Sequence, residues 1–239
     1  MEEKIINETI KIRKEKSIYI IEFEYSSYQL INSLIKTHII VGGSTDESYK
    51  SLRFKAESVK TLSEYLDEKK VKNGVKKFLV SDVAKMIRSL TWQLTHLIEV
   101  ESHTILAYNP AYIIVINGEK FAYLGSELVA DFGTGSGGED MAMISCPFSS
   151  KEIFASPELL KVKELPSFIH YKTAYFSLGL LIIYVLLGDD DFYKNFLMHN
   201  NSSIILNVLN NNPVKNTRIY WLLSRCLVEE PKDRSIILI

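Results

Sequence analysis

The sequence predicts an α+β fold in which a strand-rich amino-terminal part precedes a mainly helical remainder. Two patterns lead to this expectation. β-Prone and alternating runs are concentrated in residues 1–56, and helical periodicity begins at residue 57. The chain has 239 residues, of which 46% are hydrophobic and 24% charged, a globular composition that can bury a sizeable core.

The first 56 residues contain two predicted strands with one helix between them. Residues 17–23 are β-prone, and residues 49–56 alternate so that Leu52 and Phe54 share one face. Ser26 is expected to cap the intervening helix, because apolar residues recur at helical spacing after it. Residues 38–41 are then expected to be extended.

Two helices are predicted next. Thr61-Leu62-Ser63-Glu64 is a capping-box signature, in which the threonine and glutamate side chains each bond to the other's backbone N–H. Ser81 precedes the clearest helix of the sequence, because an apolar stripe continues for more than four turns after it. The stripe consists of Val83, Met86, Ile87, Leu90, Leu94, Leu97 and Ile98.

The middle of the chain returns to short strands, expected at residues 104–107, 112–116 and 120–124. Asn117-Gly118 is a favoured hairpin turn between the last two. Residues 126–154 contain clustered glycines with serines and threonines, and we expect little regular structure there.

The carboxyl-terminal part is expected to be helical. Residues 173–188 carry no charge but are too few for a membrane-spanning helix, which needs roughly 20 residues, so they predict a helix buried in a protein core. Thr217 is expected to cap a helix with an apolar face, and residues 235–239 to start another. That face consists of Ile219, Leu222, Leu223 and Cys226.

Charge and cysteine content exclude several classes of protein. The 28 Lys and Arg residues balance 29 Asp and Glu residues, which argues against a nucleic-acid or membrane-surface binder. Cys146 and Cys226 are too few for a disulfide framework, and each is expected to be a buried thiol in a reducing compartment. The amino terminus lacks the apolar stretch of a signal peptide. We therefore expect a cytoplasmic protein without a membrane span.

Two charged runs are candidates for a metal site or a binding surface. Asp189-Asp190-Asp191 is expected to be a solvated loop, since three consecutive acids point in different directions, although a metal site is the alternative. A lysine cluster is expected to be a solvated face, the alternatives being a dock for an acidic partner or RNA. It consists of Lys69, Lys70, Lys72, Lys76 and Lys77.

Three motifs in the carboxyl-terminal part together resemble those of the protein kinase family. Ile153-Phe154-Ala155-Ser156-Pro157-Glu158-Leu159-Leu160 is similar to the A-P-E motif that closes the kinase activation segment. Tyr175-Phe176-Ser177-Leu178-Gly179 resembles the start of that family's central buried helix. Cys226-Leu227-Val228-Glu229-Glu230-Pro231-Lys232-Asp233-Arg234 resembles its C-L-x-x-x-P-x-x-R element. The resemblance covers residues 48–239 and is faint before them.

The resemblance implies a bilobal fold and one structural ion pair. Residues 1–56 would form a reduced, strand-rich amino-terminal lobe, and residues 57–239 a larger, mainly helical lobe. Kinases pair the A-P-E glutamate with the arginine of the last motif, which implies an ion pair between Glu158 and Arg234 here.

The same resemblance implies that the catalytic residues of a kinase are missing. The family's catalytic loop corresponds to residues 105–112, which places Ala107 at the base aspartate and Tyr112 at the metal-binding asparagine. Tyr123 takes the position of the magnesium-binding aspartate. None of these three accepts a proton or binds a hard cation well. The helix aspartate that braces the loop in kinases corresponds to Ala174, which indicates a loop that no longer needs bracing.

The amino-terminal machinery of a kinase is also missing. The first glycine is Gly42, so no glycine-rich phosphate loop precedes it. The strand that should carry the phosphate-binding lysine has Glu22 near that place, and residues 25–45 contain no acid to act as the lysine's partner.

Asp131-Phe132-Gly133 leaves one alternative open. Asp131 is either a metal ligand that follows a longer hairpin or part of a chance tripeptide in a glycine-rich loop, and the hairpin spacing favours chance. The resulting hypothesis is a pseudokinase without ATP or magnesium, which acts as a scaffold or allosteric regulator on a protein partner, such as an active kinase or its substrate. The alternatives are an atypical active kinase that uses Asp131, a nucleotide-binding switch, and a nucleic-acid adaptor.

Overall fold

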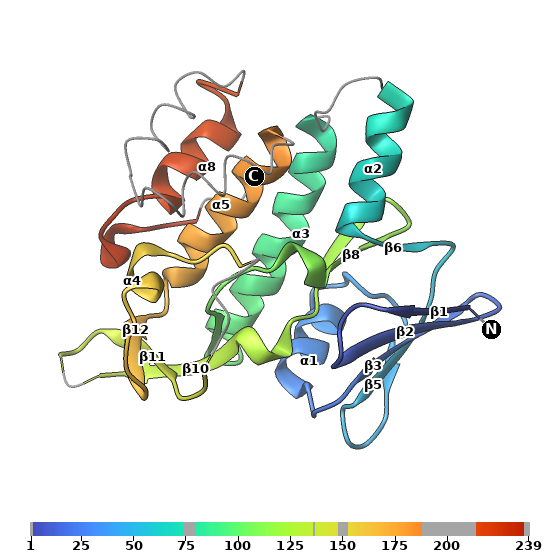
Figure 1. Cartoon of the computed structure of the whole chain (residues 1–239), viewed down its shortest axis with the longest axis horizontal. Coiled ribbons are helices and arrows are strands. Elements are labelled where there is room, and N and C mark those ends of the chain that lie inside the picture. The colour runs from blue at the N-terminus through green and yellow to red at the C-terminus, as the bar shows by residue number, and fades with distance from the viewer. Residues whose placement is uncertain (1, 74–79, 136, 148–152, 188–213, 237–239) are drawn as a thin grey trace.

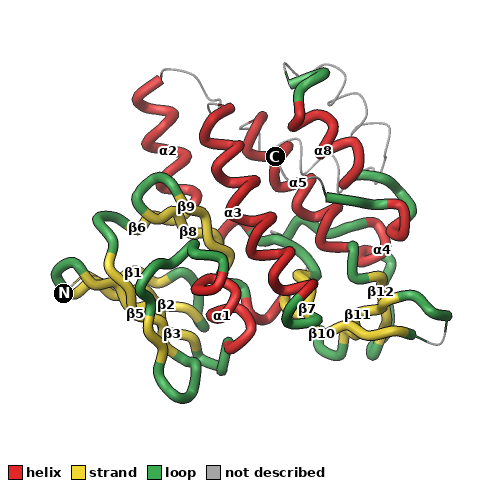
Figure 2. Tube along the Cα trace, turned by 180° about the vertical axis from the view of Figure 1, so that it is seen from behind, coloured by secondary structure: helices red, strands yellow, loops and turns green. Residues whose placement is uncertain are grey.

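The computed structural model describes residues 2–73, 80–135, 137–147, 153–187 and 214–236. Within them the fold is α+β, with three antiparallel sheets and six α-helices (Figure 1). The five-stranded sheet with α1 lies to one side of α3, and the remaining sheets and helices surround α3 and α5 (Figures 1 and 2).

The amino-terminal residues build the five-stranded sheet, which confirms the two strands expected there. Tyr19 and Phe54 face each other across the two central strands and stack with ring centroids 6.1 Å apart. Leu52 and Phe54 are buried, whereas Arg53 points outward, as the alternation predicts. In spatial order the strands are β1 (Glu2–Ile5), β2 (Ile10–Glu15), β3 (Ile18–Phe23), β5 (Ser51–Lys55) and β4 (Ser44–Thr45).

Helix α1 (Tyr28–Lys36) follows the predicted pattern but begins after Ser27, one residue beyond the expected cap. Its buried face contains Leu30 and Leu34. The expectation of an extended segment at residues 38–41 is wrong. His38 takes a positive φ of 56°, and Ile40 donates its N–H to the Leu34 carbonyl at 3.0 Å, so the chain turns back over the helix end.

The three-stranded sheet contains the predicted hairpin. Asn117 and Gly118 both have positive φ, 53° and 67°, as a two-residue turn of type I′ requires. The strands are β6 (Val59–Thr61), β8 (Ile113–Ile116) and β9 (Lys120–Tyr123), paired in that order.

The four-stranded sheet corrects the prediction of little regular structure in residues 126–154. Two of its strands lie there, because β10 finds a partner in β7 and β11 finds one in β12, all antiparallel. Pairing with distant strands overrides the weak local preference of a glycine-rich segment. In spatial order the strands are β12 (Ser167–His170), β11 (Asp140–Ile144), β10 (Val129–Thr134) and β7 (His103–Ile105).

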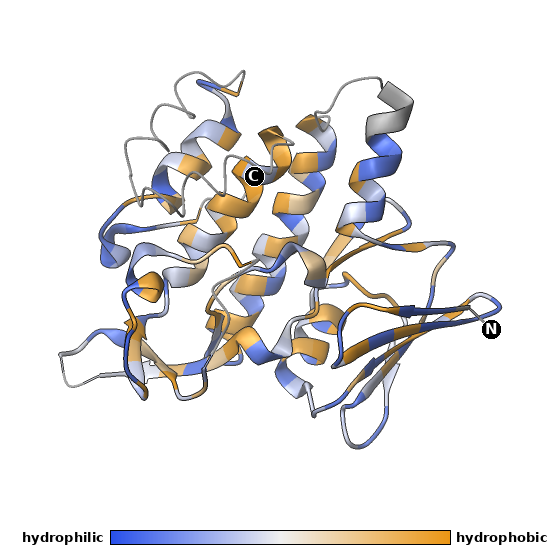
Figure 3. Cartoon of the chain, in the orientation of Figure 1, coloured by the Kyte–Doolittle hydropathy of each residue, from blue (hydrophilic) through white to orange (hydrophobic). Residues whose placement is uncertain are grey.

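The helical core is formed by α3 and α5, which lie side by side (Figures 1 and 2). Six members of the predicted stripe of α3 are fully buried, and α5 carries no charge, is almost entirely buried and is most hydrophobic towards its carboxyl end (Figure 3). The prediction of a buried helix is therefore confirmed. No helix among the described residues is long and apolar enough to cross a membrane. Besides α1, the helices are α2 (Leu62–Asn73), α3 (Val80–Glu99), α4 (Pro157–Leu160), α5 (Thr173–Leu187) and α8 (Arg218–Cys226).

Two of the three predicted caps, at Thr61 and Thr217, are present. The N–H of Thr61 donates to the Glu64 carboxylate at 2.8 Å, and the N–H of Glu64 donates to the Thr61 hydroxyl at 3.2 Å, which completes the capping box. Thr217 caps α8. After the short 3-10 helix Pro231–Asp233, Ser235 is not helical, so the predicted final helix does not start there.

Candidate functional site

The segment between β7 and β8 carries the positions at which the family resemblance places the catalytic groups. It runs through residues 106–109 and ends in the 3-10 helix Pro110–Tyr112. Asn109 caps this turn, since its Oδ1 accepts the N–H of Ala111 at 2.9 Å. We refer to residues 106–112 as the central loop.

An aromatic cluster fills the space beside the central loop. Tyr123, the last residue of β9, is fully buried and donates its hydroxyl to the Ala107 carbonyl at 3.1 Å. Its ring packs against Tyr108 at a centroid distance of 4.9 Å and against Tyr112 at 6.4 Å. The structure therefore brings together Ala107, Tyr112 and Tyr123, the three positions identified in the sequence.

This cluster is electrically neutral. Burial raises the pKa of Tyr108 and holds the pKa of Tyr123 well above its ordinary value, so both phenols keep their protons at neutral pH. Ala107 is fully buried and offers no acidic group. Neutral phenols in an apolar setting neither abstract a proton from a hydroxyl nor replace the carboxylate ligands of magnesium.

The central loop is held from α5 by hydroxyl groups. The N–H of Tyr108 donates to the Ser177 hydroxyl at 2.7 Å, and Thr173 donates its hydroxyl to the Leu106 carbonyl at 3.3 Å. The resemblance at Ala174 indicated a loop that needs no bracing, but neutral groups on the same helix brace it.

Gln93 of α3 is a site residue that the sequence reasoning missed. Its side-chain amide accepts the Tyr123 N–H at 3.0 Å and donates to the Tyr123 carbonyl at 2.9 Å, so it takes the place of a neighbouring strand beside β9. It is fully buried. The available signal was an amide between two members of the apolar stripe, Leu90 and Leu94, where a buried polar group needs partners.

Gly125 was also missed. A Cβ at this position would lie 2.5 Å from both Tyr112 Cδ2 and Tyr123 Oη, which is closer than packed atoms approach. The glycine therefore lets the backbone pass directly over the aromatic cluster.

The turn between β1 and β2 reaches the cluster from the five-stranded sheet. Asn7 donates its side-chain amide to the Tyr112 hydroxyl at 3.0 Å. Glu22, the acid near the expected lysine position, forms an ion pair with Arg13 on the neighbouring strand. The turn contributes an asparagine side chain, where a phosphate loop would contribute glycine backbone N–H groups.

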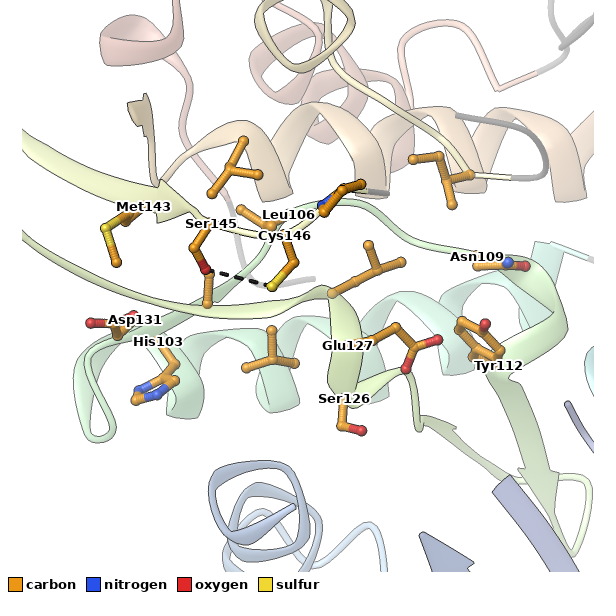
Figure 4. A pocket seen from close by; sticks show the side chains of 16 residues that line it. His103, Leu106, Asn109, Tyr112, Ser126, Glu127, Asp131, Met143, Ser145 and Cys146 are labelled. Atoms are coloured by element: carbon orange, nitrogen blue, oxygen red, sulfur yellow. Dashed lines mark hydrogen bonds between the residues drawn. The ribbon is translucent and has the colours of Figure 1, made fainter. Parts of the chain in front are cut away.

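Asp131 lies away from the aromatic cluster. It belongs to β10, where its backbone lies opposite that of His103 in the neighbouring strand β7. Its side chain is exposed. Phe132 beside it stacks on Tyr171 with ring centroids 4.8 Å apart. Figure 4 shows Asp131 at the opposite end of a cavity from Asn109 and Tyr112. The tripeptide therefore lies in a strand that follows a short hairpin.

The ion pair implied by the resemblance is present. Arg234 is fully buried, and its two terminal nitrogens donate to the two carboxylate oxygens of Glu158, one of them at 2.9 Å. The remaining donors bond to the carbonyls of Val228 and Glu229, each at 2.8 Å, and of Lys172 at 3.4 Å. The guanidinium carbon lies 4.8 Å from the ring centroid of Phe176. We call this group the arginine cluster.

A cavity of about 750 Å³ separates the central loop from β10 and residues 143–147. Its inner wall is apolar, and its polar lining includes Glu127 and Asp131 (Figure 4). A second cavity of about 440 Å³ lies between the β1–β2 turn and the same central loop. Tyr112, Ser126 and Glu127 line both, so the two cavities adjoin.

The other candidates of the sequence have separate outcomes. Lys69 forms an ion pair with Asp82 at 3.2 Å; of the remaining lysine cluster, the side chains of Lys70 and Lys72 and all of Lys76 and Lys77 lie outside the described residues, as does Asp189-Asp190-Asp191. Both cysteines are free, but Cys146 is exposed, contrary to the prediction, because it follows the end of β11 at the cavity rim. Within the described part of the chain, no three His, Cys, Asp or Glu side chains gather as a metal site.

Comparison of the chain with protein-family models finds no match, and the curated proteins contain no match either.

Proposed function

We propose that this protein is a kinase-like pseudokinase with a reduced amino-terminal lobe, which acts through contacts with a protein partner and transfers no phosphate. In this proposal residues 2–55 correspond to the small lobe and the part that begins with β6 to the larger one. The arginine cluster supports the relation to kinases, because it joins two motifs that are 76 positions apart in the sequence.

The observation that carries the proposal is the neutral aromatic cluster. The positions of the base and of both metal ligands are occupied by Ala107, Tyr112 and Tyr123, and two of these side chains pack on each other. A general base contributes roughly 10²–10⁴-fold to such a reaction, and the metal ions stabilise most of the developing charge. Loss of all three leaves no group to promote phosphoryl transfer.

The exposed acids near the cluster argue against bound nucleotide. Glu8, Glu24 and Glu127 line the cavity beside the β1–β2 turn, and that cavity has no Lys or Arg in its described lining. A triphosphate there would face carboxylates without a lysine to neutralise it. The nucleotide-binding switch is therefore the less favoured function.

The test is a phosphoryl-transfer assay with the full chain, Mg²⁺, labelled ATP and a general protein substrate. We expect incorporation at the level of a protein-free blank, and the same for Asp131→Asn. Activity that Asp131→Asn abolishes, but that the exposed-acid control Glu47→Gln retains, would establish an atypical active kinase and refute the proposal.

A thermal-shift measurement with ATP, with and without Mg²⁺, separates the nucleotide switch from the scaffold. Because ligand binding to the native state raises its stability, a nucleotide site would raise the melting temperature by several degrees at about 100 times the dissociation constant. We expect no shift at millimolar ATP.

A further inference from the structure

The two adjoining cavities form one groove whose described lining contains four carboxylates and one histidine, His103. We call it the acidic groove. It extends from Glu8 and Glu24 beside the β1–β2 turn, past Glu127 at the junction, to Asp131 at the far end. The close-up shows Glu127 between Asp131 and Tyr112 (Figure 4). No lysine or arginine is among the described residues that line either cavity.

The four groove carboxylates have no basic partner that would offset their charge among the described residues. Each is exposed, and none forms an ion pair with another described residue. Elsewhere acids are paired with Lys or Arg, as in Arg13–Glu22, Lys60–Glu68 and Lys85–Glu119. The whole chain carries a net charge of only −1, so this negative charge is a local property of the groove.

The shape of the groove suits an extended chain. A cavity of about 750 Å³ continues into one of about 440 Å³, and the larger has an apolar inner wall that includes Leu106, Leu128 and Ile153. Tyr25 is two-thirds exposed at the narrow end, where an aromatic face can receive a cation. Carboxylates spaced along an apolar trough complement arginine or lysine side chains that flank an apolar one.

We propose that the acidic groove binds an extended, arginine- or lysine-rich segment of a partner protein. This inference rests on the proposed function, because it specifies the partner through which a pseudokinase would act. The basic segment would cross the central loop at Tyr112 and Glu127, over the space where an active kinase would carry out its chemistry.

The test uses the full chain and a fluorescent hexapeptide of five arginines and one central leucine, with binding followed by anisotropy. A groove variant combines Glu8→Gln, Glu24→Gln, Glu127→Gln and Asp131→Asn. A control variant has the same change in net charge on exposed acids outside the groove: Glu47→Gln, Glu57→Gln, Glu164→Gln and Glu229→Gln. We expect the groove variant to weaken binding about tenfold or more and the control to change it less than about twofold, because exposed charge pairs contribute modestly one by one and act over short range.

Three outcomes would overturn the inference: equal loss of binding in both variants, no binding of the peptide at millimolar concentration, or equally tight binding of spermine, which would indicate a simple cation site. The result is separable from the proposed function. Phosphoryl transfer by a protein that binds the peptide normally would refute the pseudokinase and retain the groove. Absence of both transfer and peptide binding would refute the groove alone.

Discussion

The arginine cluster and the aromatic cluster are two buried groups that both contact helix α5, and only the first of them contains charged side chains. Phe176 lies against the guanidinium of Arg234, while the next residue, Ser177, accepts the N–H of Tyr108. The first cluster retains a full ion pair, and the second contains only neutral groups. Neighbouring positions of one helix thus support charge on one side and exclude it on the other.

The difference follows from hydrogen bonding. A buried charge is tolerated when every donor has a partner, and Arg234 has two carboxylate oxygens and three carbonyls in reach. The aromatic cluster has no such set of partners for a charged side chain. The molecule therefore keeps a buried ion pair where it joins distant segments of the fold and has no charged side chain in the aromatic cluster beside the central loop.

Removing the arginine should give the largest effect. Arg234→Ala leaves the Glu158 carboxylate and three carbonyls without this donor, so we expect the free energy of unfolding to fall by about 3–5 kcal/mol in urea titrations. Arg225→Ala on the exposed face of α8 is the control and should change stability by less than about 0.5 kcal/mol. Equal effects of the two variants would show that the cluster does not stabilise the fold.

The second-largest loss of stability is expected for Gln93→Leu, beside the aromatic cluster. This change leaves the buried N–H and carbonyl of Tyr123 unpaired, each at a cost of roughly 1–3 kcal/mol, so we expect a loss of about 3 kcal/mol in the same assay. Gln29→Leu, a matched change on α1 at a side chain with no hydrogen bond among the described residues, serves as control. A loss no greater than that of the control would mean that Gln93 does not support the site.

The smallest expected effect is the change of stability with pH. It comes from buried groups that keep their protons in the folded state. Burial raises the pKa of Cys226 from 9.0 to about 12, and it also raises the pKa values of Tyr108 and Tyr123. These groups hold their protons longer in the folded state than in the unfolded state. Their contribution to stability is therefore complete below about pH 9 for Cys226 and below about pH 10 for the two tyrosines, and it is lost as pH rises above these values, at about 1.4 kcal/mol per pH unit for each group.

Urea titrations at pH 7, 9 and 11 measure this loss. Tyr123→Phe should make the alkaline decline shallower, because one titrating phenol is gone, whereas Tyr25→Phe at an exposed position should leave it unchanged. An alkaline slope that is the same in all three proteins would contradict the assignment of Tyr123 as a buried neutral phenol.

The features that the sequence predicted correctly depend on local patterns. The stripe of α3, the capping box at Thr61 and the hairpin at Asn117 each need only neighbouring residues. The strands β10 and β11 could not be predicted in that way, because glycines weaken the local signal of the hairpin that they form and their outer partners, β7 and β12, lie well away in the chain. The turn at His38 failed for a related reason, since it depends on how the chain packs over the end of α1.

The residues of the candidate site likewise include some that the sequence predicted and some that depend on distant contacts. Motif order predicted Ala107, Tyr112 and Tyr123, and the structure brings them into contact. Gln93 and Ser177 escaped prediction because their bonds to Tyr123 and Tyr108 span 30 and 69 positions, distances over which a single sequence gives no sign of contact. The acidic groove likewise depends on a juxtaposition of the first 26 residues with residues 126–131.

The side chain of Asn117 has a consequence for motion. Its Oδ1 accepts the N–H groups of Glu57 and Ser58 at 2.9 and 3.1 Å, which secures the linker between β5 and β6 to the hairpin turn. Contacts of Lys4 with Glu64 and of Asn7 with Tyr112 hold the opposite end of the same sheet. Because both ends are held, these contacts restrict rotation of the five-stranded sheet against the rest of the molecule. The acidic groove therefore keeps its width before a ligand binds. A ligand would then lose little binding energy to ordering of the sheet.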